Sequence, residues 1–152
     1  MSELKEGYKA PHFKGIDQNG DTISLEDFKG KKLILYFYPK DDTPGCTKEA
    51  CNLRDNYNEL KNTGFEVVGV SADTSSKHVK FIEKYDLPFS LIADTDKEVI
   101  NAFGCWGPKK FMGREYEGIL RKTFVIEDET ILKAFEKVKT TAHFEQIMEA
   151  LN

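Results

Sequence analysis

Six consecutive apolar residues, Leu33 to Tyr38, constrain this chain more than any other segment. Such a run is too short to cross a bilayer, which takes about 20 residues in a helix. Unbroken apolar character over this length is typical of a strand that is buried on both faces. Residues 32–38 therefore predict a central strand in a sheet that is covered on both sides.

Helices and apolar strands are predicted to alternate around this strand, and an antiparallel pair follows. In chain order we expect a hairpin of 13–17 and 22–25 around Asn19-Gly20, the strand 32–38, a loop and helix over 42–62, and a strand at 65–71. A helix at 75–85 with Val79, Ile82 and Tyr85 on one face, a strand at 89–93 and a helix at 97–103 are expected next. The chain is then expected to form a hairpin of 122–126 and 131–135 and a last helix, capped by Thr141, that carries Phe144, Ile147, Met148 and Leu151 on one face.

This order predicts an α/β fold with a central mixed β-sheet, helices on both faces and an N-terminal β-hairpin. A thioredoxin-like sandwich fits the order, and spacing alone also allows a flavodoxin-like sheet. The 152 residues contain neither a repeat nor a linker-like stretch, so we expect 1–152 to form a single domain.

The charge balance argues against several classes of partner. Twenty-two Lys and Arg stand against 26 Asp and Glu, which gives a net charge of −4, and the two signs are well mixed along the chain. We therefore expect no nucleic-acid partner and no membrane-surface binding. The first residues lack the apolar core of a secretory signal, so a cytoplasmic location is expected.

The chain has three cysteines, Cys46, Cys51 and Cys105. An odd number in a chain of this length is unlike a secreted disulfide scaffold. In a reducing compartment, such cysteines are expected to be either reactive or simply buried.

The residues around Cys46 point to a helix start. Pro39 ends the apolar strand because it has no N–H for the ladder, Thr43 is a good N-cap, and Pro44 suits the first helical position. Cys46 then falls in the first turn. Free backbone N–H groups and the positive end of the helix dipole favour a thiolate there.

An inert role for Cys46 is the competing interpretation. Five residues at helical spacing form one stripe that is expected to face the core, which also suits a small buried thiol: Cys46, Ala50, Leu53, Tyr57 and Leu60. The Thr-Pro-Gly sequence before Cys46 favours the reactive interpretation.

Cys46 and Cys51 are five residues apart, which in a helix gives a rise of about 7.5 Å and a rotation of about 140°. Their Cα atoms would lie about 8.5 Å apart, whereas a disulfide needs ~4.4–6.8 Å. We therefore predict that the two cysteines can bond only after the first turns of the helix unwind.

Other cysteine chemistries find less support. His12, His78 and His143 stand alone in the sequence, without the paired spacing of a zinc site or the context of a Cys-His hydrolase. The Cys-x2-Cys motif of dithiol oxidoreductases is absent. Arg121 begins an apolar strand, where its planar cation suits an anion, although a surface ion pair is equally open.

At this point the residues resemble a known family. The signature Pro39-x3-Thr43-x2-Cys46 is that of the peroxiredoxins, and the whole chain from about residue 7 is similar to the bacterioferritin-comigratory-protein branch, also called peroxiredoxin Q. The matching segments are 36–51, Leu53-Arg54-Asp55, Gly69-Val70-Ser71-x-Asp73, Phe103-Gly104-x-Trp106-Gly107 and 118–126.

The resemblance implies a role for each matching residue. Cys46 is identified as the peroxidatic cysteine and Cys51 as the resolving cysteine. Thr43 matches the hydroxyl that bonds thiolate and peroxide, and Pro39 the ring that shields them. The arginine that steadies the transition state and the motif acid are matched by Arg121 and Glu49. Cys105 matches no required position.

The predicted function is therefore a thiol-dependent peroxidase that reduces hydrogen peroxide and organic hydroperoxides. The resemblance implies thioredoxin or a similar dithiol as reductant, a monomer, and no metal, haem or flavin. Three alternatives stay open at this stage: a thiol-disulfide oxidoreductase, a redox sensor that unfolds on oxidation, and a structural domain with inert thiols.

Overall fold

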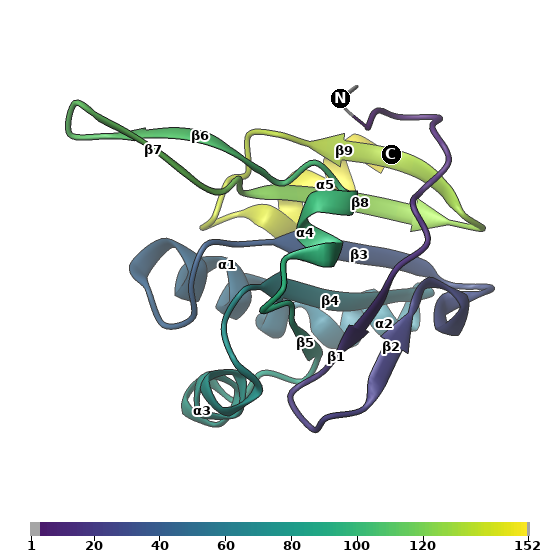
Figure 1. Ribbon diagram of the computed structural model, residues 1–152. Coiled ribbons are helices and arrows are strands. Elements are labelled where there is room, and N and C mark those ends of the chain that lie inside the picture. Colours follow the sequence, from purple (N-terminus) through teal and green to yellow (C-terminus); the bar gives the residue numbers. More distant parts are fainter. Residues whose placement is uncertain (1–3, 152) are drawn as a thin grey trace.

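A computed structural model describes residues 4–151 of the chain. Its five-stranded sheet has the order β5-β4-β3-β8-β9. The strands are β3 (Lys32–Phe37), β4 (Phe65–Ser71), β5 (Ser90–Ala93), β8 (Lys122–Glu127) and β9 (Thr130–Phe135). β4 and β5 run parallel to β3, β8 pairs antiparallel with β3, and β9 pairs antiparallel with β8 (Figure 1). The mixed sheet confirms the predicted fold class, and it excludes the all-parallel flavodoxin-like alternative.

β3 is the central strand, as its apolar run predicts. Its side chains alternate between two cores because successive residues of a strand point to opposite faces. Leu33, Leu35 and Phe37 belong to one core, and Ile34, Tyr36 and Tyr38 to the other. The strand ends at Phe37. The N–H of Tyr38 still bonds to Val70, and Pro39 stops the ladder one residue later.

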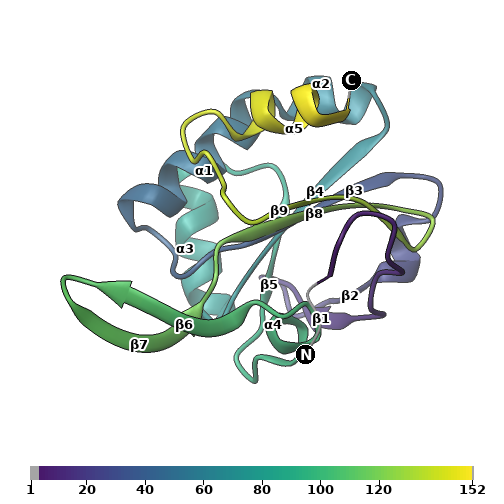
Figure 2. The ribbon, with the colours of Figure 1, turned by 90° about the horizontal axis from the view of Figure 1, so that it is seen from above.

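The two faces of the sheet carry different layers (Figure 2). One face is covered by α1 (Pro44–Asp55), α2 (Tyr57–Asn62), α3 (Ser75–Tyr85) and α5 (His143–Leu151). The other face carries the N-terminal hairpin of β1 (Lys14–Ile16) and β2 (Thr22–Ser24), the short 3-10 helix η1 (Leu25–Phe28) and α4 (Glu98–Ala102). The predicted N-terminal hairpin is thus confirmed.

The long helix expected within 42–62 is two helices in the structure. Asn56 breaks it with φ −111° and ψ 10°, and its side-chain amide donates to the carbonyl of Asn52. A short polar side chain that competes for a helical carbonyl is a recognised reason for such a break. The apolar stripe survives the break, because Cys46, Leu53 and Leu60 still lie in one core.

Two helix details differ from the prediction. The inward face of α3 is centred on His78 and Phe81, rather than on Val79. α5 begins at His143, so Thr141 does not cap it. The N–H of Phe144 bonds instead to Oδ1 of Asn52 at 2.7 Å, so the cap comes from a neighbouring helix.

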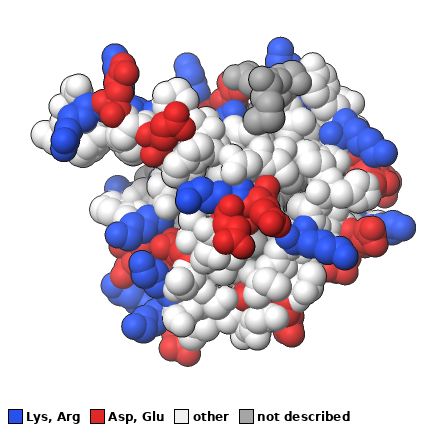
Figure 3. Space-filling model, in the orientation of Figure 1, with Lys and Arg blue, Asp and Glu red and all other residues white. Residues whose placement is uncertain are grey.

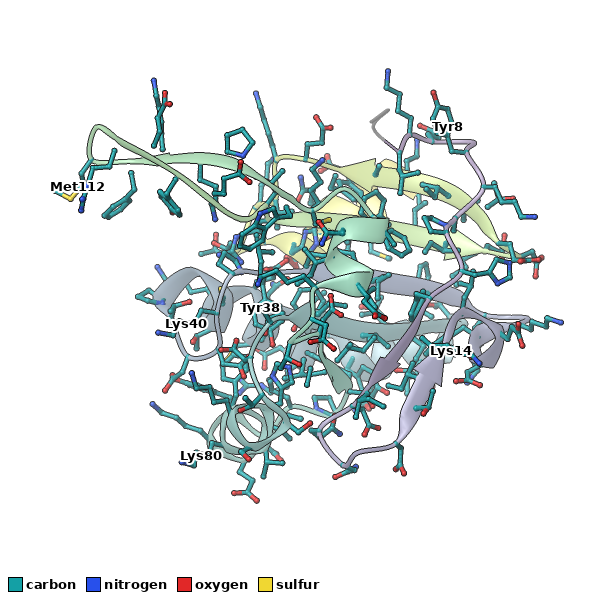
Figure 4. The ribbon with its side chains drawn as sticks, in the orientation of Figure 1. Tyr8, Lys14, Tyr38, Lys40, Lys80 and Met112 are labelled. Carbon is teal, nitrogen blue, oxygen red and sulfur yellow. The ribbon has the colours of Figure 1, made fainter. Side chains whose placement is uncertain are left out.

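A hairpin that the sequence did not predict projects from the body of the molecule. It consists of β6 (Trp106–Phe111) and β7 (Arg114–Ile119), joined by Met112 and Gly113 with φ of 52° and 80° (Figures 1 and 4). Its tip is exposed, with Phe111 at 65% and Met112 at 87%. Because neither face of its tip is buried, its residues lack the alternation by which strands are recognised.

Charged side chains of both signs share the surface (Figure 3). One depression beside α3 is lined by residues of both signs, Lys40, Asp42, Asp73, Lys77, Lys80 and Lys84. Figure 4 labels two of them, Lys40 on the loop before α1 and Lys80 on α3. Among residues 4–151, no helix is long and apolar enough to cross a membrane.

Asn52 provides a test of the α1–α5 contact. Its side chain receives the N–H of Phe144 and donates to Thr141 and Glu145. We expect Asn52→Ala to lower the free energy of unfolding by about 1–2 kcal/mol in urea denaturation, because a helix cap is lost. Asn58→Ala, on the exposed side of α2, is the matched control and should change it by less than about 0.5 kcal/mol. Equal effects of the two variants would contradict the capping role.

Candidate active site

Cys46 lies in the first turn of α1, directly beyond the end of β3. Thr43 is the N-cap and Pro44 the first helical residue, as predicted, and the first helical hydrogen bond joins Thr47 N–H to the Thr43 carbonyl. The N–H of Cys46 itself precedes that bond, so it points out of the helix end. Cys46 as a whole residue is only 1% exposed.

Arg121 joins Cys46 to Glu49 with two separate nitrogens. Its Nη2 donates to Cys46 Sγ at 3.2 Å, and its Nη1 donates to Glu49 Oε1 at 2.8 Å. Arg121 directly precedes β8, whereas the other two residues are one turn apart on α1. The structure thus brings these three predicted site residues together, and a surface ion pair no longer describes Arg121.

Glu49 is fully buried beside this arginine. Burial raises the pKa of Glu49 to about 7, even though Arg121 opposes the shift. Its second oxygen, Oε2, has no hydrogen-bond partner within residues 4–151. That oxygen lies 3.7 Å from Nε2 of His143. The buried hydroxyl of Tyr36 lies on the same side of the sheet, where burial and the charge of Glu49 raise the pKa of Tyr36.

Thr43 and Pro39 flank the cysteine, with contacts that differ in part from those predicted. The hydroxyl of Thr43 donates to the Lys40 carbonyl at 2.8 Å, and it does not accept a bond from the helix. Thr43 is thus an N-cap by position only. Its contact with thiolate and peroxide stays a prediction, as does the shielding role of Pro39, which is partly buried.

The loop that carries Pro39 and Thr43 is held by a buried polar network that the sequence did not reveal. The Asp41 carboxylate accepts from Tyr38 Oη at 2.5 Å and lies 2.6 Å from His78 Nδ1. The N–H of Asp41 donates to Asp73, and His78 Nε2 donates to the Ile92 carbonyl. Because these residues come from separate elements, no spacing in the sequence marks them as partners.

Cys51 and Cys105 occupy different surroundings. Cys51 lies on α1 with Cys46, and both are free thiols, as expected for an intact helix. Partial burial raises the pKa of Cys51. Cys105 is buried in the opposite core, where desolvation raises the pKa of its thiol to about 12. Cys105 is therefore held as a neutral thiol away from the site.

The described residues contain no group of three or more His, Cys, Asp or Glu side chains arranged to hold a metal ion.

The profile of the AhpC/TSA family matches residues 7–135, which is most of the chain. The chain belongs to the AhpC/TSA family.

Similar proteins place the chain within this family. It is 45% identical to Peroxiredoxin Bcp of Escherichia coli K12 over 99% of this chain and 97% of the relative. The structure of PrxQ from Xylella fastidiosa superimposes with a TM-score of 0.91 over 99% of this chain and 97% of that one, at 29% identity. The bacterioferritin comigratory protein of Xanthomonas campestris gives 0.84 over 91% and 89%, at 32% identity. The predicted resemblance to the Bcp and peroxiredoxin Q branch is confirmed.

Arg121 offers a direct test of the site of this AhpC/TSA protein. We expect Arg121→Lys to slow the reaction of reduced protein with hydrogen peroxide about 10²-fold in stopped-flow measurements. Lysine has a single ammonium nitrogen and lacks the two spaced nitrogens with which Arg121 contacts the sulfur and the carboxylate. Arg114→Lys, on the exposed hairpin, is the control and should leave the rate unchanged. A rate within threefold of the parent protein in Arg121→Lys would contradict the bridging role.

The ionisation of Glu49 can be measured separately. In a ¹³C NMR titration of the glutamate carboxyls, we expect one resonance with a midpoint near 7, absent in Glu49→Gln, because burial penalises the charged form. An unperturbed glutamate titrates at about 4.3, which keeps the two kinds of signal apart. Below its midpoint the neutral carboxyl holds Arg121 less strongly, so the peroxide rate should also fall. A Glu49 midpoint under 5 would show that Arg121 outweighs burial.

Proposed function

We propose that this peroxiredoxin reduces hydroperoxides at Cys46, with Arg121 and Glu49 as the supporting pair. The observation that carries the proposal is the 3.2 Å contact between Arg121 Nη2 and Cys46 Sγ at a helix N-terminus. A cation and free backbone N–H groups both favour a thiolate over a thiol. Alkyl peroxide reduction is the activity named for the bacterioferritin comigratory protein of Xanthomonas campestris, which supports organic hydroperoxides as a substrate class.

In the first step, the Cys46 thiolate attacks the terminal oxygen of the hydroperoxide in line with the O–O bond. An S–O bond forms and the O–O bond breaks, so sulfur is oxidised by two electrons to sulfenic acid. The departing oxygen takes a proton from solvent and leaves as water or an alcohol. Arg121, the Cys46 N–H and the Thr43 hydroxyl are proposed to hold the two oxygens while the negative charge moves.

In the second step, Cys51 resolves the sulfenic acid. The two cysteines lie on one helix, so the first turns of α1 must unwind before a Cys46–Cys51 disulfide forms and water leaves. Unwinding serves a second purpose as well. The thiol of Cys51 has a raised pKa while it is partly buried. Exposure to water after unwinding removes this desolvation and lowers the pKa towards its ordinary value. Both the distance between the cysteines and the raised pKa of Cys51 therefore keep Cys51 from attacking the sulfenic acid until the helix unwinds.

An external dithiol then reduces the disulfide by exchange and restores two thiols. We propose thioredoxin or a similar dithiol protein for this role. We also propose a monomer in the cytoplasm, where reducing conditions keep structural disulfides rare and where both cysteines of the cycle come from one chain. The sulfur atoms carry both electrons throughout, so the cycle needs no further redox group.

The test combines peptide mapping with three cysteine variants. Reduced protein is mixed with one equivalent of hydrogen peroxide, free thiols are alkylated, and linked peptides are identified by mass. We expect a Cys46–Cys51 linkage within seconds and an alkylated Cys105. Cys46→Ser should abolish the reaction, whereas Cys51→Ser should keep one turnover and lose at least 90% of thioredoxin-coupled cycling.

Cys105→Ser is the matched control, and it should cycle as the parent protein does. Full steady-state activity in Cys51→Ser would contradict its resolving role. An unreacted Cys46 thiol in the parent protein would overturn the peroxidase itself. Oxidation without turnover by any dithiol would favour a redox sensor.

A further inference from the structure

The C-terminal segment, residues 137–151, lies beyond the part of the chain that the family profile matches, which ends at 135. It follows β9 and returns over the helical face, where α5 contacts α1 (Figure 2). Its approach to the site is close. A Cβ placed on Gly45 would lie 3.2 Å from Arg121 Nη2 and 4.0 Å from the methyl group of Thr140. The segment thus reaches the residue next to Cys46.

His143, the first residue of α5, is the buried titratable group of this segment. Its Nε2 lies 2.8 Å from Thr123 Oγ1, and its Nδ1 lies 3.0 Å from Gln146 Oε1. The same Gln146 oxygen accepts the backbone N–H of Lys139, which identifies it as the amide oxygen. Nδ1 of His143 therefore carries the proton, and Nε2 accepts from the Thr123 hydroxyl.

The charge state of His143 follows from its surroundings. Burial, with the nearby Arg121 cation, lowers the pKa of His143 to about 4. The groups that face it are Arg121 just before β8, Thr123 on β8, Glu49 on α1, Gln146 on α5, and the ring of Phe135 on β9, edge-on at 5.9 Å. His143 is therefore a neutral ring held in one tautomer at pH 7.

Glu49 lies between this ring and the arginine. Its Oε1 is fixed by Arg121 at 2.8 Å, and its Oε2 faces His143 Nε2 at 3.7 Å without a hydrogen-bond partner in 4–151. Because Oε2 forms no hydrogen bond within the described residues, its position depends on the atoms packed against it. At this distance the ring of His143 is in contact with the carboxylate and would block its rotation away from Arg121.

We propose that His143 is a positioning residue: it fixes Glu49, and through Glu49 it holds Arg121 against Cys46, so that the C-terminal segment 137–151 completes the active site. This inference rests on the proposed peroxidase function. A displacement of about 1 Å in a reacting geometry can cost about 10²-fold in rate, so loss of the contact between His143 and Glu49 should slow the peroxide reaction measurably.

The test uses two substitutions of His143 and one control. His143→Phe keeps a ring against Phe135 and removes both nitrogens, whereas His143→Gln keeps an acceptor for Thr123. We expect the peroxide reaction of the reduced protein to slow about 10- to 100-fold in His143→Phe and to stay within about threefold of the parent in His143→Gln. His12→Phe, at a histidine side chain that is 57% exposed, should react as the parent does.

A second readout separates positioning from a merely structural role. The amide of His143→Gln places an N–H donor beside Glu49 Oε2, which stabilises the carboxylate. The Glu49 midpoint in the ¹³C NMR titration should therefore move below the parent's value. Loss of packing alone would leave it in place. Should His143→Phe fail to fold, Thr123→Val carries the test, since it removes the hydroxyl that orients Nε2 and should slow the reaction at least threefold.

Each outcome decides the inference. Equal rates in the parent and the folded His143→Phe protein, or an unmoved Glu49 midpoint in His143→Gln, would overturn the positioning role and leave the proposed function intact. A parent protein that does not react with peroxide at Cys46 would overturn the proposed function, and the positioning role with it. A slowed His143→Phe, a rescued His143→Gln and a shifted midpoint together would establish it.

Discussion

The contact of one guanidinium with both Cys46 and Glu49 is the interaction on which the site depends. It exists because β8 runs antiparallel to β3 in a register that pairs Lys122 with Phe37. Arg121, one residue before β8, is thereby placed at the edge where β3 ends and the loop to α1 begins. A shift of that register by one residue would turn the alternate side chains of β8 to the other core.

This arrangement carries a cost in stability. Glu49 is a fully buried carboxyl whose pKa burial raises to about 7, and one of its oxygens lacks a hydrogen bond within the described residues. Buried ion pairs seldom stabilise a fold better than well-packed apolar side chains would. The pair is therefore better explained by what it does to Cys46 than by what it adds to the core. The neutral ring of His143 fits the same explanation, because it packs against the Glu49 carboxylate without adding charge.

In the proposed cycle, the helix that carries the site has to unwind. The first turn of α1 holds Cys46 beside Arg121, and the same helix keeps Cys51 too far away to bond. Hydrogen bonds hold the chain on either side of the two cysteines. The Asp41–His78 network holds the loop before the helix, and Asn52 ties the middle of α1 to α5. The proposed unwinding is therefore expected to stay within the stretch between these hydrogen bonds.

Local patterns in the chain were enough to predict the central strand, the helix start at Pro44, the cysteine in its first turn and the incompatibility of a Cys46–Cys51 bond with that helix. Side-chain period, proline and helical rise set these features, and none of them needs a distant partner. The same patterns did not reveal the break at Asn56, the β6–β7 hairpin, the cap of α5, or the partners of His78 and His143. The break at Asn56 accompanies a local bond from its side chain to Asn52, whereas the others depend on contacts between residues distant in the chain, or on the absence of a buried face. The meeting of Arg121 with Glu49 belongs to this second group, because they lie 72 positions apart and only the register of β8 on β3, with the packing of α1 at the end of β3, brings them within hydrogen-bond distance.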